Sequence, residues 1–134
     1  MAAFEHRLRA RYHECDPQGI VFNANHIAYV DVALTELWRE AFGSYEQMNE
    51  LGYDMVVVDV HAAFRAPVPF DAEMTLALTI ERFGRTSMTT HWVTTVDGQV
   101  CVEGEIIHVW IAGERSEPAE IPAAAREVLA PYLA

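Results

Sequence analysis

The sequence predicts an α+β fold in which an antiparallel sheet packs on one long helix. One segment, roughly residues 26–42, repeats its apolar residues with a helical period. Four later segments alternate apolar and polar side chains and are joined largely by hairpin turns. Because hairpins join antiparallel neighbours, these patterns favour a two-layer architecture over alternating βαβ winding.

The length and composition predict a single domain over residues 1–134. The chain has 134 residues, of which 51% are apolar, and it contains no repeat, linker or low-complexity tract. A chain of this size can bury one core and leaves no room for a second.

The N-terminal third is predicted to hold a strand, a loop and the long helix. Residues 4–12 alternate apolar and charged side chains, as on a strand with one face in water. The loop HECDPQGIVFNANH, residues 13–26, then leads into the helix of residues 26–42, and Gly43 ends it. This helix carries so much apolar surface that we expect the sheet to wrap around it.

The remaining elements are mostly strands. Residues 44–52 are predicted as a short helix or a turn, and residues 123–133 as a terminal helix that Pro131 interrupts. Asp97-Gly98 is a strong signal for a two-residue hairpin. The four predicted strands span residues 55–65, 73–82, 86–96 and 99–112.

The charge balance excludes several classes of partner and chemistry. The formal net charge is −11, and all nine basic residues are arginines. Nucleic acids and anionic membranes bind clustered positive charge, so neither is an expected partner. Since the chain has no lysine, it cannot form a lysine Schiff base or a P-loop. With no apolar run long enough for a membrane span or a signal peptide, we expect a cytoplasmic protein.

Neither a metal nor a redox cofactor is expected. Cys15 and Cys101 stand alone and fit free thiols in a reducing compartment better than a disulfide. The polar side chains of residues 13–26 have no recognised metal-binding spacing. The GxSxG, HExxH and GxGxxG signatures are missing from the sequence.

Asp16 has two interpretations on residue types and spacing alone. An Asp-Pro pair often opens a turn, and this structural role is the more common one. Alternatively, Asp16 is a catalytic carboxylate next to Gly19, which lets backbone approach a ligand, and next to the unpaired N–H groups of residues 23–26. A carboxylate beside amide donors can attack a carbonyl, or activate water against it, while the donors hold the oxyanion. The second interpretation predicts acyl transfer.

Three arginines are the candidates for contact with a phosphorylated ligand. Arg65, Arg82 and Arg85 stand at predicted strand ends and turns, where arginines also serve to keep sheet edges soluble. In so acidic a chain they are nevertheless the groups best suited to bind phosphate.

Two segments resemble a known family. RYHECDPQGIVFNANHIAYVDVALTELWREAF, residues 11–42, resembles the opening of the hotdog-fold acyl-CoA thioesterases of the 4-hydroxybenzoyl-CoA thioesterase family. The family's pattern there is Asp, two residues, Gly, two apolar residues and an aromatic, followed by Asn at the start of the long helix. FRAPVPFDAEMTLALTIERFGRTSMTTHW, residues 64–92, resembles a later segment of the same family.

The resemblance implies a fold and an activity. The fold would be a hotdog, a five-stranded antiparallel sheet wrapped around one long helix, with a short C-terminal helix. The activity would be hydrolysis of acyl-CoA or acyl carrier protein thioesters without a cofactor. Asp16 would act as nucleophile, through a mixed anhydride, or as general base, and the backbone N–H of Asn23 would point at the thioester oxygen.

The resemblance also implies how substrate is bound. Hotdog thioesterases are dimers in which the acyl group enters between subunits, so a homodimer or homotetramer is expected. Arg65, Arg82 and Arg85 would contact the CoA phosphates. Asp31 matches an acid that meets the hydroxyl of a hydroxylated aromatic acyl group from the neighbouring subunit, although an acid on a helix is also common as a solvated residue.

The sequence departs from the family pattern at two positions that bear on the acyl pocket. Asn23 replaces an aromatic residue or a histidine, and His26 stands where an aromatic residue is usual. Catalysis by a backbone N–H tolerates both changes.

Two other functions remain alternatives. One is a hotdog hydratase or dehydratase, although no histidine follows the motif for that chemistry. The other is a non-catalytic module that binds acyl thioesters.

Overall fold

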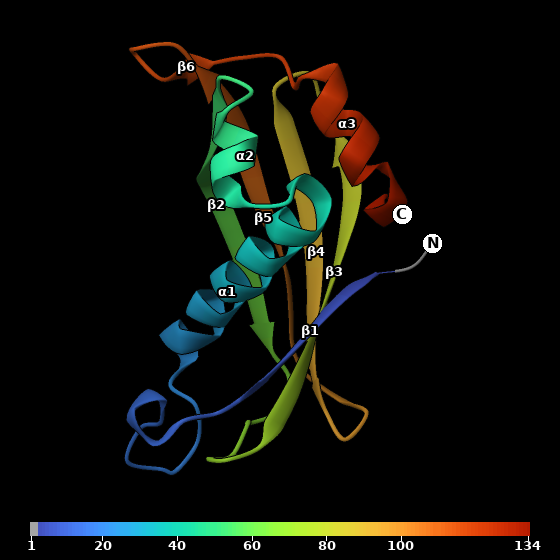
Figure 1. Cartoon of the computed structure of the whole chain (residues 1–134). Coiled ribbons are helices and arrows are strands. Elements are labelled where there is room, and N and C mark those ends of the chain that lie inside the picture. The colour runs from blue at the N-terminus through green and yellow to red at the C-terminus, as the bar shows by residue number, and fades with distance from the viewer. Residues whose placement is uncertain (1–2) are drawn as a thin grey trace.

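A curved antiparallel sheet wraps around one long helix in the computed structural model, which describes residues 3–134 (Figure 1). Helix α1 lies in the concavity of the sheet, and α3 covers the sheet at the end where the chain terminates. The helices are α1 (Asn23–Phe42), α2 (Tyr45–Asn49) and α3 (Ala123–Leu129), with 3₁₀ turns at Tyr12–Glu14 and Ala130–Tyr132. The strands are β1 (Phe4–Arg9), β2 (Tyr53–Phe64), β3 (Glu73–Phe83), β4 (Ser87–Val96), β5 (Gln99–Ala112) and β6 (Glu117–Pro118).

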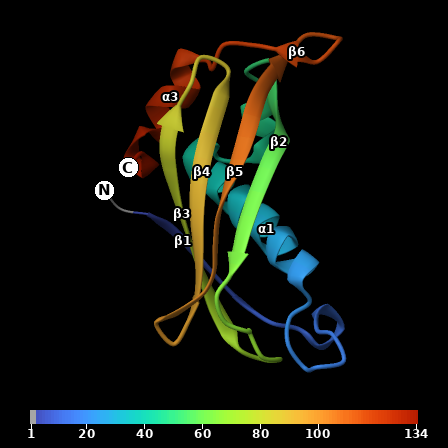
Figure 2. The same ribbon diagram turned by 180° about the vertical axis from the view of Figure 1, so that it is seen from behind.

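The strands run in the order β1-β3-β4-β5-β2, and β6 pairs with β5. All pairings between these strands are antiparallel. Hairpins join β3 to β4 and β4 to β5, while β1 and β2 form the two edges of the main sheet, as the view from behind shows (Figure 2). The predicted antiparallel, helix-covered architecture is therefore confirmed.

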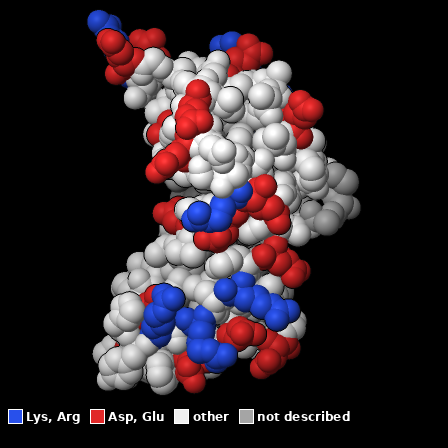
Figure 3. Space-filling model, viewed as in Figure 1, with Lys and Arg blue, Asp and Glu red and all other residues white. Residues whose placement is uncertain are grey.

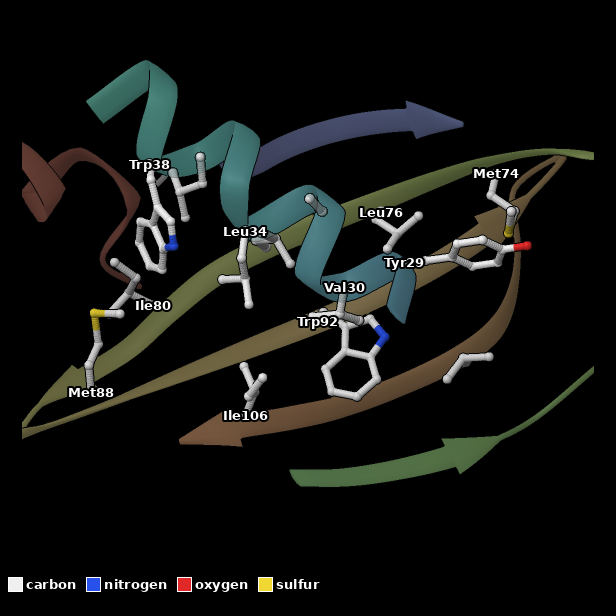
Figure 4. Packing of buried hydrophobic residues seen from close by; sticks show 14 of the residues in the cluster. Tyr29, Val30, Leu34, Trp38, Met74, Leu76, Ile80, Met88, Trp92 and Ile106 are labelled. Carbon is white, nitrogen blue, oxygen red and sulfur yellow. The ribbon is translucent and has the colours of Figure 1, made fainter. Parts of the chain in front are cut away.

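The core lies between the apolar face of α1 and the inner face of the sheet. Val30, Leu34 and Leu37 of the helix are at most 2% exposed. In Figure 4, Val30 and Leu34 lie over Trp92 and Ile106 of the sheet. Burial of one such large side chain stabilises the fold by roughly 1.5–3 kcal/mol. This face, which the helical period predicts, fixes the rotation of α1 and hence the direction of its exposed side chains.

Two boundaries near the loop of residues 13–26 differ from the prediction. Helix α1 begins at Asn23, three residues earlier than predicted, and β1 ends at Arg9. The polar residues at the start of the helix hide its apolar period there. Beyond Arg9 the chain turns away from β3 into the 3₁₀ turn, which the alternation of residues 10–12 does not reveal.

Strand β2 contains a bulge that the alternation of residues 55–65 does not predict. Val57 pairs with His108 and Asp59 with Ile107, so Val58 is an extra residue on β2. A bulge reverses the alternation of side chains beyond it. The regular alternation predicted for residues 55–65 is therefore wrong at this point, because the side chains before and after Val58 alternate out of phase.

No helix within residues 3–134 is long and apolar enough to cross a membrane.

Candidate active site

Asp16 lies in a tight turn between the 3₁₀ turn and α1. The Asp16 carbonyl accepts a hydrogen bond from the Gly19 N–H at 2.9 Å, and Asp16 Oδ1 accepts one from the Gln18 N–H at 2.8 Å. The Asp16 N–H donates to the Ile20 carbonyl at 2.9 Å. Gly19 has φ +78°, a left-handed conformation that other residues adopt only with strain. Hydrogen bonds of its own backbone thus hold the turn. This geometry is compatible with Asp16 as a turn residue and with Asp16 as a catalytic carboxylate.

The N-terminus of α1 is open to a ligand. Phe22 occupies the N-cap position, and within the described chain no side chain caps the helix. In the same residues 3–134, the N–H groups of Asn23 and Ala24 donate to no protein acceptor. The first turn also carries no acidic residue. Free N–H groups and the helix dipole make this end suited to bind an anion or a developing oxyanion.

A pocket of about 550 Å³ joins the turn, the helix N-terminus and the end of β2. Ligand pockets in proteins span roughly 300–1,000 Å³, so this one can hold a small acyl group. Asp16 and Asn23 both line it, so the two candidate catalytic residues border one space. The lining residues are Asp16, Gln18, Ile20, Val21, Phe22, Asn23, His26, Phe64, Arg65, Ala66 and Pro67.

Asp16 also borders a second hollow of about 390 Å³. Gly19 lines this hollow together with Tyr12 and Phe70, whose rings meet edge-on at a centroid distance of 5.8 Å. Asp16 is therefore a lining residue of both spaces. Gly19 shapes the turn and the second hollow, and it stands apart from the residues that line the main pocket.

His26 is a buried histidine of the pocket wall. It is 4% exposed, and its Nδ1 atom has no hydrogen-bond partner in the described chain. The ring lies 5.9 Å, centroid to centroid, from both Tyr29 and Phe64. Burial lowers the pKa of His26, so the imidazole is neutral at neutral pH. The pocket wall thus offers a neutral imidazole where an aromatic residue is usual in the family that the sequence resembles.

Of the three predicted phosphate-binding arginines, the structure brings only Arg65 to the pocket. Its guanidinium is exposed and lies 3.2 Å from the Glu103 carboxylate. Arg82 and Arg85 lie at the far end of β3, an 11-residue strand whose first residues adjoin the Asp16 turn. A strand of that length spans roughly 35 Å. Within one chain, Arg82 and Arg85 therefore lie far from Asp16 and outside the lining of its pocket.

Basic side chains also gather near β1. On the face shown in Figure 3, acidic side chains are spread throughout, whereas most basic groups lie in the lower half, which holds β1. Arg7 and Arg9 of β1 and the adjoining Arg11 are exposed. Arg9 is neutralised by Asp71 and Glu73, at 4.0 and 3.8 Å. The sequence analysis did not find the partners of Arg9, because Asp71 and Glu73 lie about sixty residues away in the chain.

Asp31 lies on the outer face of α1, two helical turns beyond Asn23. Its side chain points away from the core, next to the exposed Val32. Partial burial raises the pKa of Asp31. The structure therefore keeps Asp31 outside the pocket of its own chain.

Glu14 is a residue of the site region that the sequence analysis missed as a functional candidate. Its side chain is only 13% exposed and accepts hydrogen bonds from the Arg11 N–H and the Tyr29 hydroxyl, both at 2.8 Å. Its carbonyl accepts from Asn25 Nδ2 at 2.7 Å. Asn25 and Tyr29 stand four residues apart on one helix face, and this spacing was the available signal.

Comparisons with known proteins identify the family. The sequence model of the family described as "Thioesterase-like superfamily" matches residues 10–129. The chain belongs to this superfamily. It is therefore a member of the thioester hydrolases, and the hotdog fold that the sequence resemblance implied is confirmed.

Two curated relatives and one solved structure illustrate the likeness. A protein of Aquifex aeolicus, provisionally named an esterase, is 24% identical over 126 residues, which cover 94% of this chain and 97% of the relative. A Bacillus subtilis protein, provisionally named an acyl-CoA thioesterase, is 23% identical over 112 residues, or 83% of this chain and 81% of the relative. The structure of a 1,4-dihydroxy-2-naphthoyl-CoA thioesterase from Synechocystis superposes with a TM-score of 0.84 at 17% identity and covers 96% of both chains.

The described residues hold no group of three or more His, Cys, Asp or Glu side chains arranged to bind a metal ion. Cys15 and Cys101 are free thiols, and burial raises the pKa of both.

Proposed function

We propose that this protein hydrolyses acyl-CoA thioesters with Asp16 as its catalytic carboxylate. One observation carries the proposal: Asp16 and Asn23, whose N–H group has no protein acceptor in the described chain, line the same pocket. A thioester carbonyl bound between them would meet a carboxylate at its carbon and an amide donor at its oxygen. This pairing is what acyl transfer requires.

The chemistry follows from these two groups. In one course, Asp16 attacks the carbonyl carbon, the Asn23 N–H holds the oxyanion, and collapse expels the thiolate to leave a mixed anhydride that water then hydrolyses. In the other, Asp16 takes a proton from a water molecule that attacks the carbonyl directly. Both courses end in a free acid and a free thiol. The dipole of the 20-residue helix α1 supports the oxyanion in each.

The rest of the pocket suggests how the two arms of the substrate lie. Phe64 and the neutral His26 offer apolar and polar contacts for the acyl group. Arg65, at the pocket rim, is the group placed to meet a CoA phosphate. The names of the Bacillus subtilis relative and the Synechocystis structure agree with CoA thioesters as the substrate class, while an acyl carrier protein thioester presents the same reacting group.

We propose further that the working unit is a homodimer joined through the edge strand β2. Val56, Val57 and Val58 of this strand are 43%, 46% and 56% exposed. An exposed apolar edge strand is a template for pairing with another chain. The pocket lies at the end of β2, beside Phe64, so a second copy on this edge would adjoin it. Asp31, and Arg82 and Arg85 at the far end of β3, would then be candidates to serve the neighbouring subunit's substrate.

The test is free-thiol release from a panel of aliphatic and hydroxyaromatic acyl-CoAs by wild type and Asp16→Asn. The amide keeps the size of the side chain and removes its charge and basicity, so we expect a loss of about 10³-fold or more in kcat. Asp97→Asn is the matched control, because it changes an aspartate in the hairpin turn between β4 and β5. N-acetylcysteamine thioesters lack the CoA phosphates. Comparing their hydrolysis with that of acyl-CoAs therefore measures how much a contact between Arg65 and a phosphate contributes.

Each result decides between functions. A loss confined to Asp16→Asn supports the proposal and the panel then names the acyl class. Equal activity of both variants with wild type would reject Asp16 as the catalytic group. Binding of CoA esters without thiol release by wild type would favour a non-catalytic binding module.

A further inference from the structure

We infer that Glu14 is a positioning residue that holds Asp16 against the helix N-terminus, and that Asn25 and Tyr29 of α1 hold Glu14. The inference rests on the proposed function of Asp16. It assigns a role in the reaction to three residues that do not touch the substrate.

Hydrogen bonds from the N-cap of its own 3₁₀ turn and from the start of α1 converge on Glu14. The Glu14 carbonyl accepts hydrogen bonds from the Phe22 N–H at 3.0 Å and from Asn25 Nδ2 at 2.7 Å. The Glu14 carboxylate accepts from the Tyr29 hydroxyl and the Arg11 N–H, both at 2.8 Å. The Arg11 bond closes the 3₁₀ turn to which Glu14 belongs, and the other three bonds join Glu14 to the N-cap and the first two turns of α1.

These bonds fix the two reacting groups relative to each other. Glu14 precedes Asp16 by two residues, and Phe22 immediately precedes Asn23, whose N–H is free. The Phe22–Glu14 bond and the bridge between Cys15 and Val21 therefore close the loop at its base. A carbonyl held between carboxylate and donor tolerates little displacement, since a misplacement of about 1 Å can cost about 100-fold in rate.

Burial and charge strengthen the hydrogen bonds to the Glu14 carboxylate. Tyr29 is 3% exposed and the Glu14 side chain 13% exposed, so water competes little for their bond. Figure 4 shows the Tyr29 hydroxyl directed out of the apolar cluster at the N-terminal end of the helix face. Burial by itself raises the pKa of Glu14, but the hydrogen bonds from Arg11 and Tyr29 and the nearby positive charge outweigh it, and the pKa is lowered overall. Glu14 is thus an ionised acceptor, and bonds to ionised acceptors are the stronger ones.

Glu14, Asn25 and Tyr29 lie outside the lining of the main pocket in the described chain. Loss of the Tyr29 hydroxyl or of the Asn25 amide therefore removes no group from the acyl or CoA contacts. A change in turnover would have to come from the geometry of Asp16 and Asn23.

The experiment compares kcat and KM for Tyr29→Phe, Asn25→Ala, Glu14→Ala and Glu14→Gln, with hydrogen exchange of the backbone amides of residues 15–23. We expect kcat to fall about 10- to 100-fold in the first three variants, with KM changed by less than about 3-fold, and the loop amides to exchange faster. Glu14→Gln keeps an oxygen acceptor for Tyr29, so it should recover much of the loss seen in Glu14→Ala. Tyr45→Phe is the matched control, because it removes a tyrosine hydroxyl that donates to the Asp54 carboxylate at 2.6 Å, away from the pocket.

The outcomes separate this inference from the proposed function. Wild-type kcat in folded Tyr29→Phe and Asn25→Ala, with Asp16→Asn inactive, overturns the positioning role alone. A rise in KM at unchanged kcat overturns it as well, since that pattern belongs to substrate contact. If wild type itself releases no thiol, the proposed function fails. If the backbone amides of residues 15–23 exchange at the same rate in the variants as in wild type, the positioning role of Glu14 is rejected whatever the kinetics show.

Discussion

At the scale of single residues, two aspartates near α1 have environments that predict separate roles. Asp16 lies in the turn beside the free N–H group of Asn23 and borders the pocket. Asp31 lies on the outer face of the helix, where partial burial raises its pKa. We therefore expect Asp16 to react with the carbonyl of a substrate in its own pocket, and Asp31 to accept a hydrogen bond from a substrate held by a second subunit.

Asp31→Asn tests the second role. A hydrogen bond from a substrate hydroxyl to a charged group contributes roughly 1.5–3 kcal/mol, so its loss should lower kcat/KM for hydroxyaromatic acyl-CoAs by about 10-fold or more. Aliphatic acyl-CoAs lack the hydroxyl and should be hydrolysed as by wild type. Glu36→Gln, another acid of α1, is the control. Equal losses across both substrate classes, or no loss in either, would contradict a hydroxyl-binding role.

At the scale of elements, α1 and β5 meet at a buried histidine. His108 of β5 is 5% exposed, and its ring meets the Trp38 ring edge-on at a centroid distance of 5.9 Å. Burial lowers the pKa of His108 from 6.5 to about 4. The side chain is therefore neutral in the folded protein at neutral pH and packs as part of the core.

This contact predicts a loss of stability in acid. As pH falls below about 6.5, His108 of the unfolded chain binds a proton, whereas His108 of the folded protein does so only near pH 4. The unfolded state holds more protons in this window, so the free energy of unfolding decreases as pH falls. Once the pH is below both pKa values, protonation of His108 has lowered the free energy of unfolding by roughly 3 kcal/mol.

Urea unfolding of wild type and His108→Leu at about pH 7 and about pH 5 measures the effect. We expect wild type to lose more stability than the variant between these values, because leucine cannot be protonated. His61→Leu, which removes an exposed histidine of β2, should keep the wild-type dependence. Parallel losses in wild type and His108→Leu would show that His108 does not titrate in this way.

At the scale of the whole molecule, the exposed edge strand β2 predicts the assembly. Val58 is the bulge residue of this strand and is 56% exposed. Val58→Lys places a charge in the proposed interface between two copies, and charged edges block strand pairing. In light scattering we expect wild type to have the mass of a dimer and the variant that of a monomer. We also expect the variant to lose activity.

Val128→Lys is the control for this substitution, because Val128 is an exposed valine of α3, 37% exposed. It should leave both mass and activity unchanged. A dimeric Val58→Lys protein, or a wild type that is monomeric and fully active, would contradict pairing through β2.

The local patterns of the sequence were sufficient for most of the elements. Helix α1 and strands β3, β4 and β5 follow from hydrophobic period and turn residues, since each pattern depends on neighbours a few positions away. The motif around Asp16 placed the candidate carboxylate before a helix N-terminus for the same reason. The predictions were wrong where this local period is interrupted. A bulge at Val58 breaks the alternation of β2, and polar residues break the apolar period at the start of α1.

The tertiary structure alone decided which distant residues share the site. It brought Arg65 and Phe64, some fifty residues along the chain, to Asp16, and it placed Arg82 and Arg85 at the other end of β3. It also joined Glu14 to Tyr29. Such contacts depend on how curved strands pack around a helix, and no period within a single segment encodes that packing. The sequence by itself therefore determined the elements and the candidate carboxylate, while the packing of those elements determined the pocket and the contacts that hold its reacting groups.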